Sequence, residues 1–440
     1  MGKKWIIGLM LLVILYGGSG LAQEPQGPLT LEESIKIALE RDLTLHSAVE
    51  GVEASKFRQK QAITNFLPQW TGQYIYTRYN RPTTIGVAPI TDAAGNLLNK
   101  SKDILNFNTF VTQPLFTGGL NLANYRLEKL GVDVSKTKVE TAKRDIVLQV
   151  RAGYFNILKT LKLRDVAEQN VKQLEAQLEV AKAFFEVGIV AKNDVLQAEV
   201  RMAQARQDLV KAENGVAVAK AYFNTLLRRD INKPFTVVDI LEYKAFPLPF
   251  EESLGEALGQ RPEIKNAEFA IKQAQESVRI ARSSYFPTVT LSGNYYRFSD
   301  EIGLGGDFPS DKWTVQTLAT FTFGDWGKTA YKVGESKVKV TQAEDLKNQL
   351  IDGITLEVKQ DYLNMLQAEK NIGVAQKAIE QAEENLRMNE ERYKYQVATA
   401  TDVLDAVTLL TQARTNYYNA LSDFNISKAQ LERSMGRMYP

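Results

Sequence analysis

The side chains in this sequence that could bind or select ions are carboxylates, and two of them share one face of an expected helix. Asp402 and Asp405 are three residues apart, which places both side chains on the same side of a helix. If that face lines a passage, rings of carboxylates there favour cations and resist anions. Crowding of like charges would also raise some of their pKa values. The alternative places Asp405 in water outside the passage.

Composition excludes most other kinds of site. The 440 residues include no cysteine and one histidine, His46, which excludes thiol chemistry, histidine-based triads and His/Cys metal sites. The full phosphate-binding motif is absent, because the Gly-Lys-Thr at 327–329 lacks a glycine five positions before it. Most carboxylates are interspersed with lysines, as on a solvated surface, which disfavours a hydrolase. The balance of 54 basic and 52 acidic residues does not favour nucleic acid. We therefore expect no enzyme activity, no cofactor, no metal and no nucleic-acid partner.

The N-terminus has the features of an export signal. Two lysines at positions 3 and 4 precede the apolar run WIIGLMLLVILY, and small residues follow up to Ala22. The apolar run is too short for a comfortable membrane helix, and no later stretch reaches 18 apolar residues. We expect a cleavable signal peptide over residues 1–22.

The sequence contains two similar halves. Asp-Val-Leu occurs at 194–196 and again at 402–404, and Gln-Ala-Arg occurs at 204–206 and 412–414. Both pairs have the same offset of 208 positions. Before these motifs the two halves remain similar, but the offset between matching residues is larger: LEESIKIAL at 31–39 resembles FEESLGEAL at 250–258. The sequence therefore predicts a tandem duplication, with repeats at 29–230 and 249–437 and a linker at 231–248 that contains prolines as breaks.

Each repeat ends in two long stretches with heptad patterning. Apolar residues recur every seven positions after the Asp-Val-Leu motif, in the first repeat at Val195, Met202, Leu209, Val216 and Phe223. A second row consists almost entirely of Ala and Ser. Sustained heptads of this kind indicate antiparallel coiled-coil helices that pack closely. The expected helices cover about 118–184, 193–229, 326–391 and 401–434.

Four segments of about ten residues alternate between polar and apolar side chains. They are expected at about 69–79, 106–117, 288–298 and 313–323. Their length and period match a membrane β-strand, and a soluble two-sheet layer is the alternative. Four strands cannot close a barrel, and open strand edges are not viable in lipid. Two chains would give a barrel filled by side chains, whereas three would leave a water-filled lumen, so we expect a trimer.

Four features together resemble one family. These are the Leu-Pro or Phe-Pro that leaves each first helix (67–68 and 286–287), the stretch QPLFTGG (113–119), and the two turns FFEVGIVAKNDVLQA (184–198) and RYKYQVATATDVLDA (392–406). In this order they resemble the TolC-like outer-membrane efflux protein family. The resemblance covers about 29–437.

The resemblance implies a fold, a location and partners. The expected fold is mainly α, with a tunnel of twelve helices capped by a twelve-stranded β-barrel that a homotrimer shares. The barrel would lie among outer-membrane lipid, and the helices would extend into the periplasm. The expected function is a passive exit duct of a tripartite efflux or type I secretion system, for small molecules or proteins. Its tip would meet a periplasmic adaptor protein and an inner-membrane pump.

The resemblance also implies a gate. Asp194, Tyr393, Asp402 and Asp405 match the family's gate and constriction positions. The alternative for Asp194 and Asp402 is that they serve only as N-cap or first-turn acids of the helices that follow the turns. In the family's best-known member, an arginine of the second turn holds the entrance shut by pairing with an acid of the first. Ala398 occupies that position here, so that link cannot form.

The two turns are the expected site of adaptor docking. The first turn places apolar residues at an exposed hairpin tip, and the second adds two more positions; together they are Val187, Gly188, Ile189, Val190, Gln396 and Val397. Family turns usually carry glycine at both equivalent positions, but the second turn here has glutamine. The alternative function is an exported coiled-coil scaffold or adhesin without a transport role.

Overall fold

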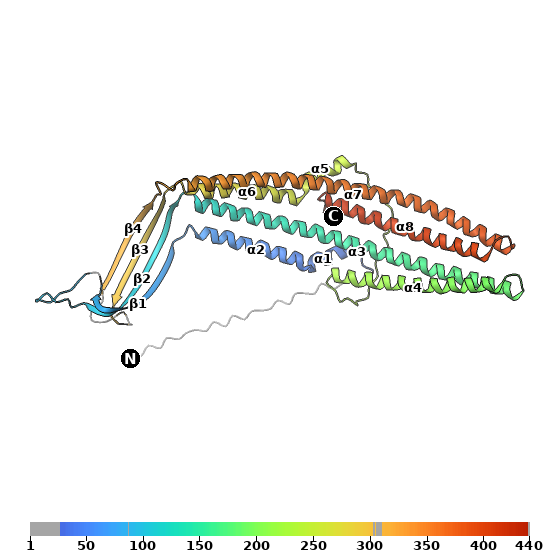
Figure 1. Ribbon diagram of the computed structural model, residues 1–440, viewed down its shortest axis with the longest axis horizontal. Coiled ribbons are helices and arrows are strands. Elements are labelled where there is room, and N and C mark those ends of the chain that lie inside the picture. Colours follow the sequence, from blue (N-terminus) through green and yellow to red (C-terminus); the bar gives the residue numbers. More distant parts are fainter. Residues whose placement is uncertain (1–26, 87, 302–303, 305–309, 439–440) are drawn as a thin grey trace.

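The computed structural model describes residues 27–86, 88–301, 304 and 310–438. The expected signal peptide, residues 1–22, lies outside these. A sheet forms one end of the elongated molecule, and long helices extend from it to the other end (Figure 1). No helix in the described ranges is long and apolar enough to cross a membrane.

Each repeat contains two short helices, two strands and two long helices, in that order. The first repeat comprises α1 (Leu31–Arg41), α2 (Leu43–Thr64), β1 (Gln69–Thr84), β2 (Lys100–Thr117), α3 (Leu120–Glu186) and α4 (Lys192–Leu226). The second comprises α5 (Phe250–Gln260), α6 (Pro262–Ser283), β3 (Thr288–Ser299), β4 (Ser310–Thr320), α7 (Lys328–Lys394) and α8 (Ala400–Ser434).

The strands differ from the expected ranges at their ends. β1 continues five residues past 79 and β2 begins six residues before 106, because the two strands pair with each other beyond a bulge that follows Arg78. β4 ends at Thr320 rather than at 323. Thr320 pairs with Thr288, the first residue of β3, so no partner strand remains for Phe321 and Phe323.

The four strands form one antiparallel sheet in the order β1-β2-β3-β4, so the central pair joins the two repeats. The pairing gathers the polar positions on one face. One row across the sheet runs Gln69, Thr112, Ser292 and Gln316. The opposite face carries aromatic and aliphatic side chains, including the exposed Trp70, Tyr74, Trp313 and Val315. The sheet thus has a polar and an apolar side, with β1 and β4 as its edges.

The two longest helices, α3 and α7, have 67 residues each, which gives a length of ~100 Å at ~1.5 Å per residue. Two glycines do not interrupt α3. Gly153 is buried, and a β-carbon there would lie 3.0 Å from Leu226 and 3.1 Å from Phe223. The missing side chain therefore lets α4 pack closely against α3.

The two repeats match in helix length and also in the backbone conformation of individual turn residues. Corresponding helices have equal lengths of 11, 22, 67 and 35 residues. Three pairs of positions that are 208 apart share a positive φ, with glycine in only one member of each pair: Gly118 and Trp326, Gly188 and Gln396, Arg228 and Gly436. The turns therefore keep their geometry in both repeats even where one of the two residues is not glycine, at a cost in backbone strain.

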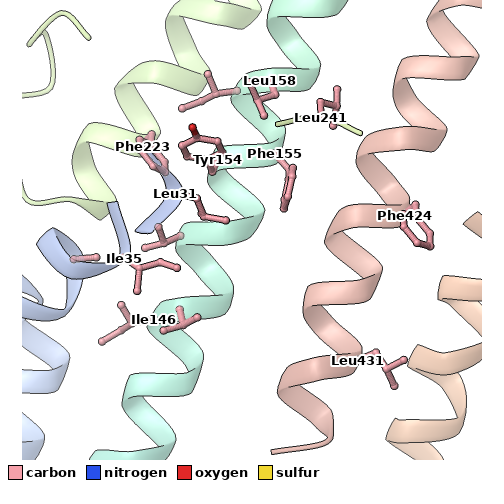
Figure 2. Packing of buried hydrophobic residues seen from close by; sticks show 14 of the residues in the cluster. Leu31, Ile35, Ile146, Tyr154, Phe155, Leu158, Phe223, Leu241, Phe424 and Leu431 are labelled. Atoms are coloured by element: carbon pink, nitrogen blue, oxygen red, sulfur yellow. The ribbon is translucent and has the colours of Figure 1, made fainter. Parts of the chain in front are cut away.

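The main core lies at the waist of the molecule, where α1, α3, α4 and α8 meet the linker (Figure 2). Tyr154 is fully buried there, and its hydroxyl lies 3.0 Å from the carbonyl oxygen of Leu29 and 2.8 Å from that of Val238. Burial raises the pKa of Tyr154 to about 12. Leu29 also forms a parallel bridge with Val237, so the linker is tied to the start of the first repeat.

A charged cluster adjoins this core. Arg261 contacts Glu263 and Glu357, and Arg433 contacts Glu357 and Asp145. Asp361 is buried beside them on α7, at the position that corresponds to Gly153 in the first repeat. Among the described residues its Oδ2 atom has no hydrogen-bond partner. Burial, with a smaller contribution from Glu357, raises the pKa of Asp361.

Candidate functional site at the helix-hairpin tips

The α3–α4 and α7–α8 turns lie together at the end of the molecule opposite the sheet (Figure 1). Both turns use the same backbone pattern. The amides of Gly188 and Ile189 donate to carbonyl oxygens in the last turn of α3, at 2.9 and 2.8 Å. Gln396 and Val397 repeat these bonds at 3.0 and 2.8 Å. A left-handed residue is needed at the first position of each pair, and Gln396 adopts it with a φ of 63°.

Asp402 lies in the first turn of α8, and its side chain bonds to the N-cap residue Thr399. Its carboxylate accepts hydrogen bonds from the amide and the hydroxyl of Thr399, at 2.7 and 2.8 Å, and Thr399 in turn accepts from the Asp402 amide at 3.2 Å. This reciprocal arrangement is a capping box. The hydrogen bond from the Thr399 amide lowers the pKa of Asp402. Within one chain, this shift is opposite to the rise expected from crowding of like charges.

Asp194 holds the corresponding position in α4 without the box. The preceding cap residue is Ala191, whose side chain cannot accept a hydrogen bond from the Asp194 amide. Asp194 is half-buried and contributes an acidic group to the first turn of α4, where it complements the helix dipole. The two Asp-Val-Leu motifs thus share a place in the fold but not the same hydrogen bonds.

Asp405 joins the two repeats. Its carboxylate lies 3.3 Å from the Arg201 guanidinium on α4. One turn nearer the tip, the Thr401 hydroxyl donates to the side-chain oxygen of Gln197 at 2.9 Å. These contacts connect α8 to α4 in the region where Ala398 prevents the family's arginine link. Asp405 is therefore an exposed member of an ion pair rather than an isolated acid in water.

Tyr393 lies beneath the tip. The ring is buried, and its centroid lies 5.5 Å from that of Phe184 on α3. Its hydroxyl has no hydrogen-bond partner within the described part of the chain. Burial raises the pKa of Tyr393, and the nearby charge of Asp194 raises it further. Asp194 on α4 and Tyr393 on α7, two of the expected gate residues, are thus neighbours.

Small and aliphatic residues pack the two hairpins together just below the turns. This tip cluster includes Leu174, Ala205, Leu386, Tyr393, Val403, Leu404, Leu410 and Ala413. Val190 packs against the cluster and is only half exposed, so it contributes less to an open tip than expected. Val187, Ile189 and Val397 are exposed, as is Tyr395, which the sequence analysis did not single out.

A groove runs between α4 and α8 beside the turns. Its lining includes Leu196, Val200 and Leu404, together with the polar contacts of Arg201 and Thr401. Leu196 and Val200 are exposed apolar side chains. Sequence reasoning missed Val200 and Arg201, because their contacts cross to residues about 200 positions away and leave no local pattern.

The arginine of the repeated Gln-Ala-Arg motif pairs the two helices of its own hairpin in both repeats. Arg206 reaches across to Glu175 on α3 at 3.4 Å, and Arg414 reaches Glu383 on α7 at 2.9 Å. The alanine before each arginine is buried. Arg414 also donates to the side-chain oxygen of Gln169 on α3 at 2.8 Å, so the second motif links the two hairpins as the Arg201–Asp405 pair does. In the first repeat, Arg206 contacts only its own hairpin among the described residues.

Comparison with known proteins agrees with this architecture. The sequence model described as "Outer membrane efflux protein" matches residues 34–227 and 253–437. The outer membrane protein TolC of Vibrio cholerae is 23% identical over 404 residues, which cover 83% of this chain and 90% of the relative. The outer membrane efflux protein BepC of Brucella suis is 22% identical over 98% of this chain and 90% of the relative.

Solved structures share the fold. A structure of CusC superposes with a TM-score of 0.79 at 17% identity, over 92% of each chain. The Campylobacter jejuni CmeC outer membrane channel gives a TM-score of 0.77 at 17% identity, over 92% of this chain and 85% of that one. The two matched repeats, the shared sheet and the long hairpins lead to one assignment. The chain belongs to the outer membrane efflux protein family.

Proposed function

We propose that this chain, an outer-membrane efflux channel whose helices extend into the periplasm, works as a homotrimeric passive duct without catalysis of its own. The observation that carries the proposal is the four-stranded sheet, which has one polar face, one apolar face and two open edges. Open edges in lipid require partners, and three copies would supply twelve strands around a water-filled lumen. The polar face would line that lumen.

The exposed tip supports a role for protein partners. Channels of this family work with periplasmic adaptors and inner-membrane pumps. Val187, Ile189, Tyr395 and Val397 expose apolar surface at the two turns, and the groove with Leu196 and Val200 continues it. Burial of such surface contributes ~25 cal/mol per Å² before the costs of association. We assign adaptor docking to this surface, with Gly188 and Gln396 setting the shape of the turns.

The acids near the tip are proposed to form the constriction. Asp402 and Asp405 lie on α8, and Asp194 and Tyr393 lie near each other at the same end of α4 and α7. Three copies would bring these acids together as rings that favour cations. The Arg201–Asp405 pair replaces the missing arginine link as a contact that holds α8 against α4.

Reconstitution tests the duct. Purified protein should form trimers in mild detergent, measured by light scattering, and should conduct ions across a planar bilayer. In a strain that lacks its own outer-membrane efflux channel, the protein should restore export when expressed with its adaptor and pump. Monomeric particles without conductance would refute the duct and would leave a scaffold or adhesin as the surviving reading. The relatives support efflux rather than that alternative.

A further inference from the structure

The waist of the second repeat has a polar contact where the first repeat has an apolar one. In the first repeat, Gly153 on α3 leaves room for Leu226 at the end of α4. The corresponding positions of the second repeat, 208 residues later, are Asp361 on α7 and Ser434 at the end of α8. Both side chains are buried. The duplication therefore keeps this contact between helices but replaces its chemistry with that of a carboxyl group and a hydroxyl.

The positive charges near Asp361 are already committed to other acids. The two arginines that face it are Arg261, at the start of α6, and Arg433, on α8. Their closest contacts, at 2.5–3.0 Å, are with three other carboxylates: Glu263, Glu357 and Asp145. Two guanidiniums thus serve three acids, and Asp361 is a fourth. An arginine that turned toward an ionised Asp361 would have to leave one of its present partners.

Ser434 offers Asp361 a partner only while the carboxyl group holds a proton. The Ser434 hydroxyl is a hydrogen-bonding neighbour of the Asp361 carboxyl, and it donates its own proton to the carbonyl oxygen of Leu431 at 3.0 Å. The serine oxygen can therefore accept a further hydrogen bond but has no second proton to give. A protonated Asp361 can donate to this oxygen, whereas an ionised Asp361 cannot. The hydrogen bond between α7 and α8 thus depends on one proton.

We propose that Asp361 and Ser434 form a proton-dependent latch, which fastens the end of α8 to α7 in acid and loosens it as the pH rises. When the proton leaves, the hydrogen bond is lost and a buried negative charge remains beside Glu357, which is costly. Burial raises the pKa of Asp361 and so moves this change toward neutral pH. Burial acts in the same direction on Glu263, but hydrogen bonds from Arg261 outweigh it and lower the pKa of Glu263, so that acid keeps its charge. The latch lies within one chain and does not depend on the proposed duct.

The latch controls more than one helix contact, because the end of α8 holds two other elements at the waist. This end lies beside α5 and far from the tips (Figure 1). Arg437, just after α8, contacts Glu256 on α5 at 2.6 Å. Arg144 on α3 donates to the carbonyl oxygen of Gly436 at 3.0 Å. Loosening of the last turns of α8 should therefore also weaken the attachment of α5 and α3, while the tips should not respond.

Amide hydrogen exchange of the full-length protein in detergent tests the latch. Asp361→Asn preserves the shape of the side chain and can donate to Ser434 at every pH, so this variant should remain fastened. The ratio of parent to variant exchange rates at one pH cancels the intrinsic pH dependence of amide exchange. In the last two turns of α8 the ratio should be near one in mild acid and about five at neutral pH, since the loss of one hydrogen bond corresponds to about that factor. At the tips it should be one at both pH values.

Asp352→Asn is the matched control, because it changes an exposed acid to an amide on the same helix, and it should give a ratio of one throughout. Where Asp361→Asn does not fold, Asp361→Gly combined with Ser434→Leu copies the contact of the first repeat and should likewise remove the pH dependence. A ratio of one at both pH values, or slower exchange in the parent than in the variant at neutral pH, would overturn the latch. Either result would leave the proposed duct untouched, because bilayer recordings test that separately.

Discussion

The Arg201 guanidinium lies 3.3 Å from the Asp405 carboxylate, and this contact joins α4 of the first repeat to α8 of the second near their tips. Both side chains are about half exposed, so the pair stabilises the contact between the two hairpins by at most ~1 kcal/mol in each copy. Three copies together would make a contribution that shifts the balance between closed and open tips. The pair is also weakened by salt, because exposed charges are screened.

Arg201→Ala should therefore increase the frequency of open-channel events in bilayer recordings, with a larger effect at low than at high salt. Arg206→Ala is the matched control, because Arg206 pairs with Glu175 inside its own hairpin and does not link the repeats. Equal opening in the two variants would show that the Arg201–Asp405 contact does not restrain the entrance.

The exposed tip residues should determine adaptor affinity. Ile189→Asp removes apolar surface at the α3–α4 turn and should weaken binding of the purified adaptor about ten- to hundredfold, since burial of one aliphatic side chain is worth ~1.5–3 kcal/mol. Ile231→Asp, at an equally exposed position after α4, should leave binding unchanged. Affinity is measured on immobilised trimers. Gly188→Asp is less informative, because a φ of 76° strains any side chain there.

Gln396→Gly should stabilise the α7–α8 turn. A non-glycine residue in the left-handed region costs about 1–2 kcal/mol, and part of that is offset by the greater freedom of glycine in the unfolded chain. We expect a gain of about 0.5–1 kcal/mol, read as slower amide hydrogen exchange in the tip. Gly188→Ala at the matching position should accelerate exchange. Faster exchange in Gln396→Gly would mean that the glutamine side chain has a stabilising contact of its own.

Much of the fold could be predicted from the sequence, because it is encoded in local periodicity and repetition. Heptads identified the long helices, and alternation identified the strands. The position where β4 ends could not be predicted, since it depends on where β3 begins. Arg201 could not be identified either, because its partner is 204 positions away and no regular spacing connects them. Asp402 was recognised as acidic and near a cap, but its tie to Thr399 depends on backbone geometry at the turn.

Asp361→Asn should increase stability at neutral pH. Burial, together with Glu357, raises the pKa of Asp361 in the folded state. An acid with a raised folded pKa favours folding most when it is protonated, so its contribution is full below the unfolded pKa and is lost as pH rises through the folded value. The neighbouring charges are Glu357, Arg261 and Arg433, and they are unchanged in the variant.

The thermal unfolding midpoint of Asp361→Asn should accordingly match that of the parent in acid and exceed it at neutral pH. Glu344→Gln, an exposed acid-to-amide change on the same helix, should shift neither. A midpoint that falls at neutral pH would show that ionised Asp361 is needed to balance the arginines nearby.

Ion selectivity tests the acids of the proposed constriction. Asp402 carries its charge with a lowered pKa, and Asp405 is partly neutralised by Arg201. Asp402→Asn should therefore reduce cation preference more than Asp405→Asn does, and Arg201→Ala should increase it. The double variant Asp402→Ala with Asp405→Ala should lose most of the preference, measured as a smaller reversal potential in a salt gradient. Mild acid should spare the Asp402 contribution unless the assembled rings raise its pKa again. Identical reversal potentials in parent and double variant would place the constriction elsewhere in the tunnel, because carboxylates at the narrowest point must affect the passing ions.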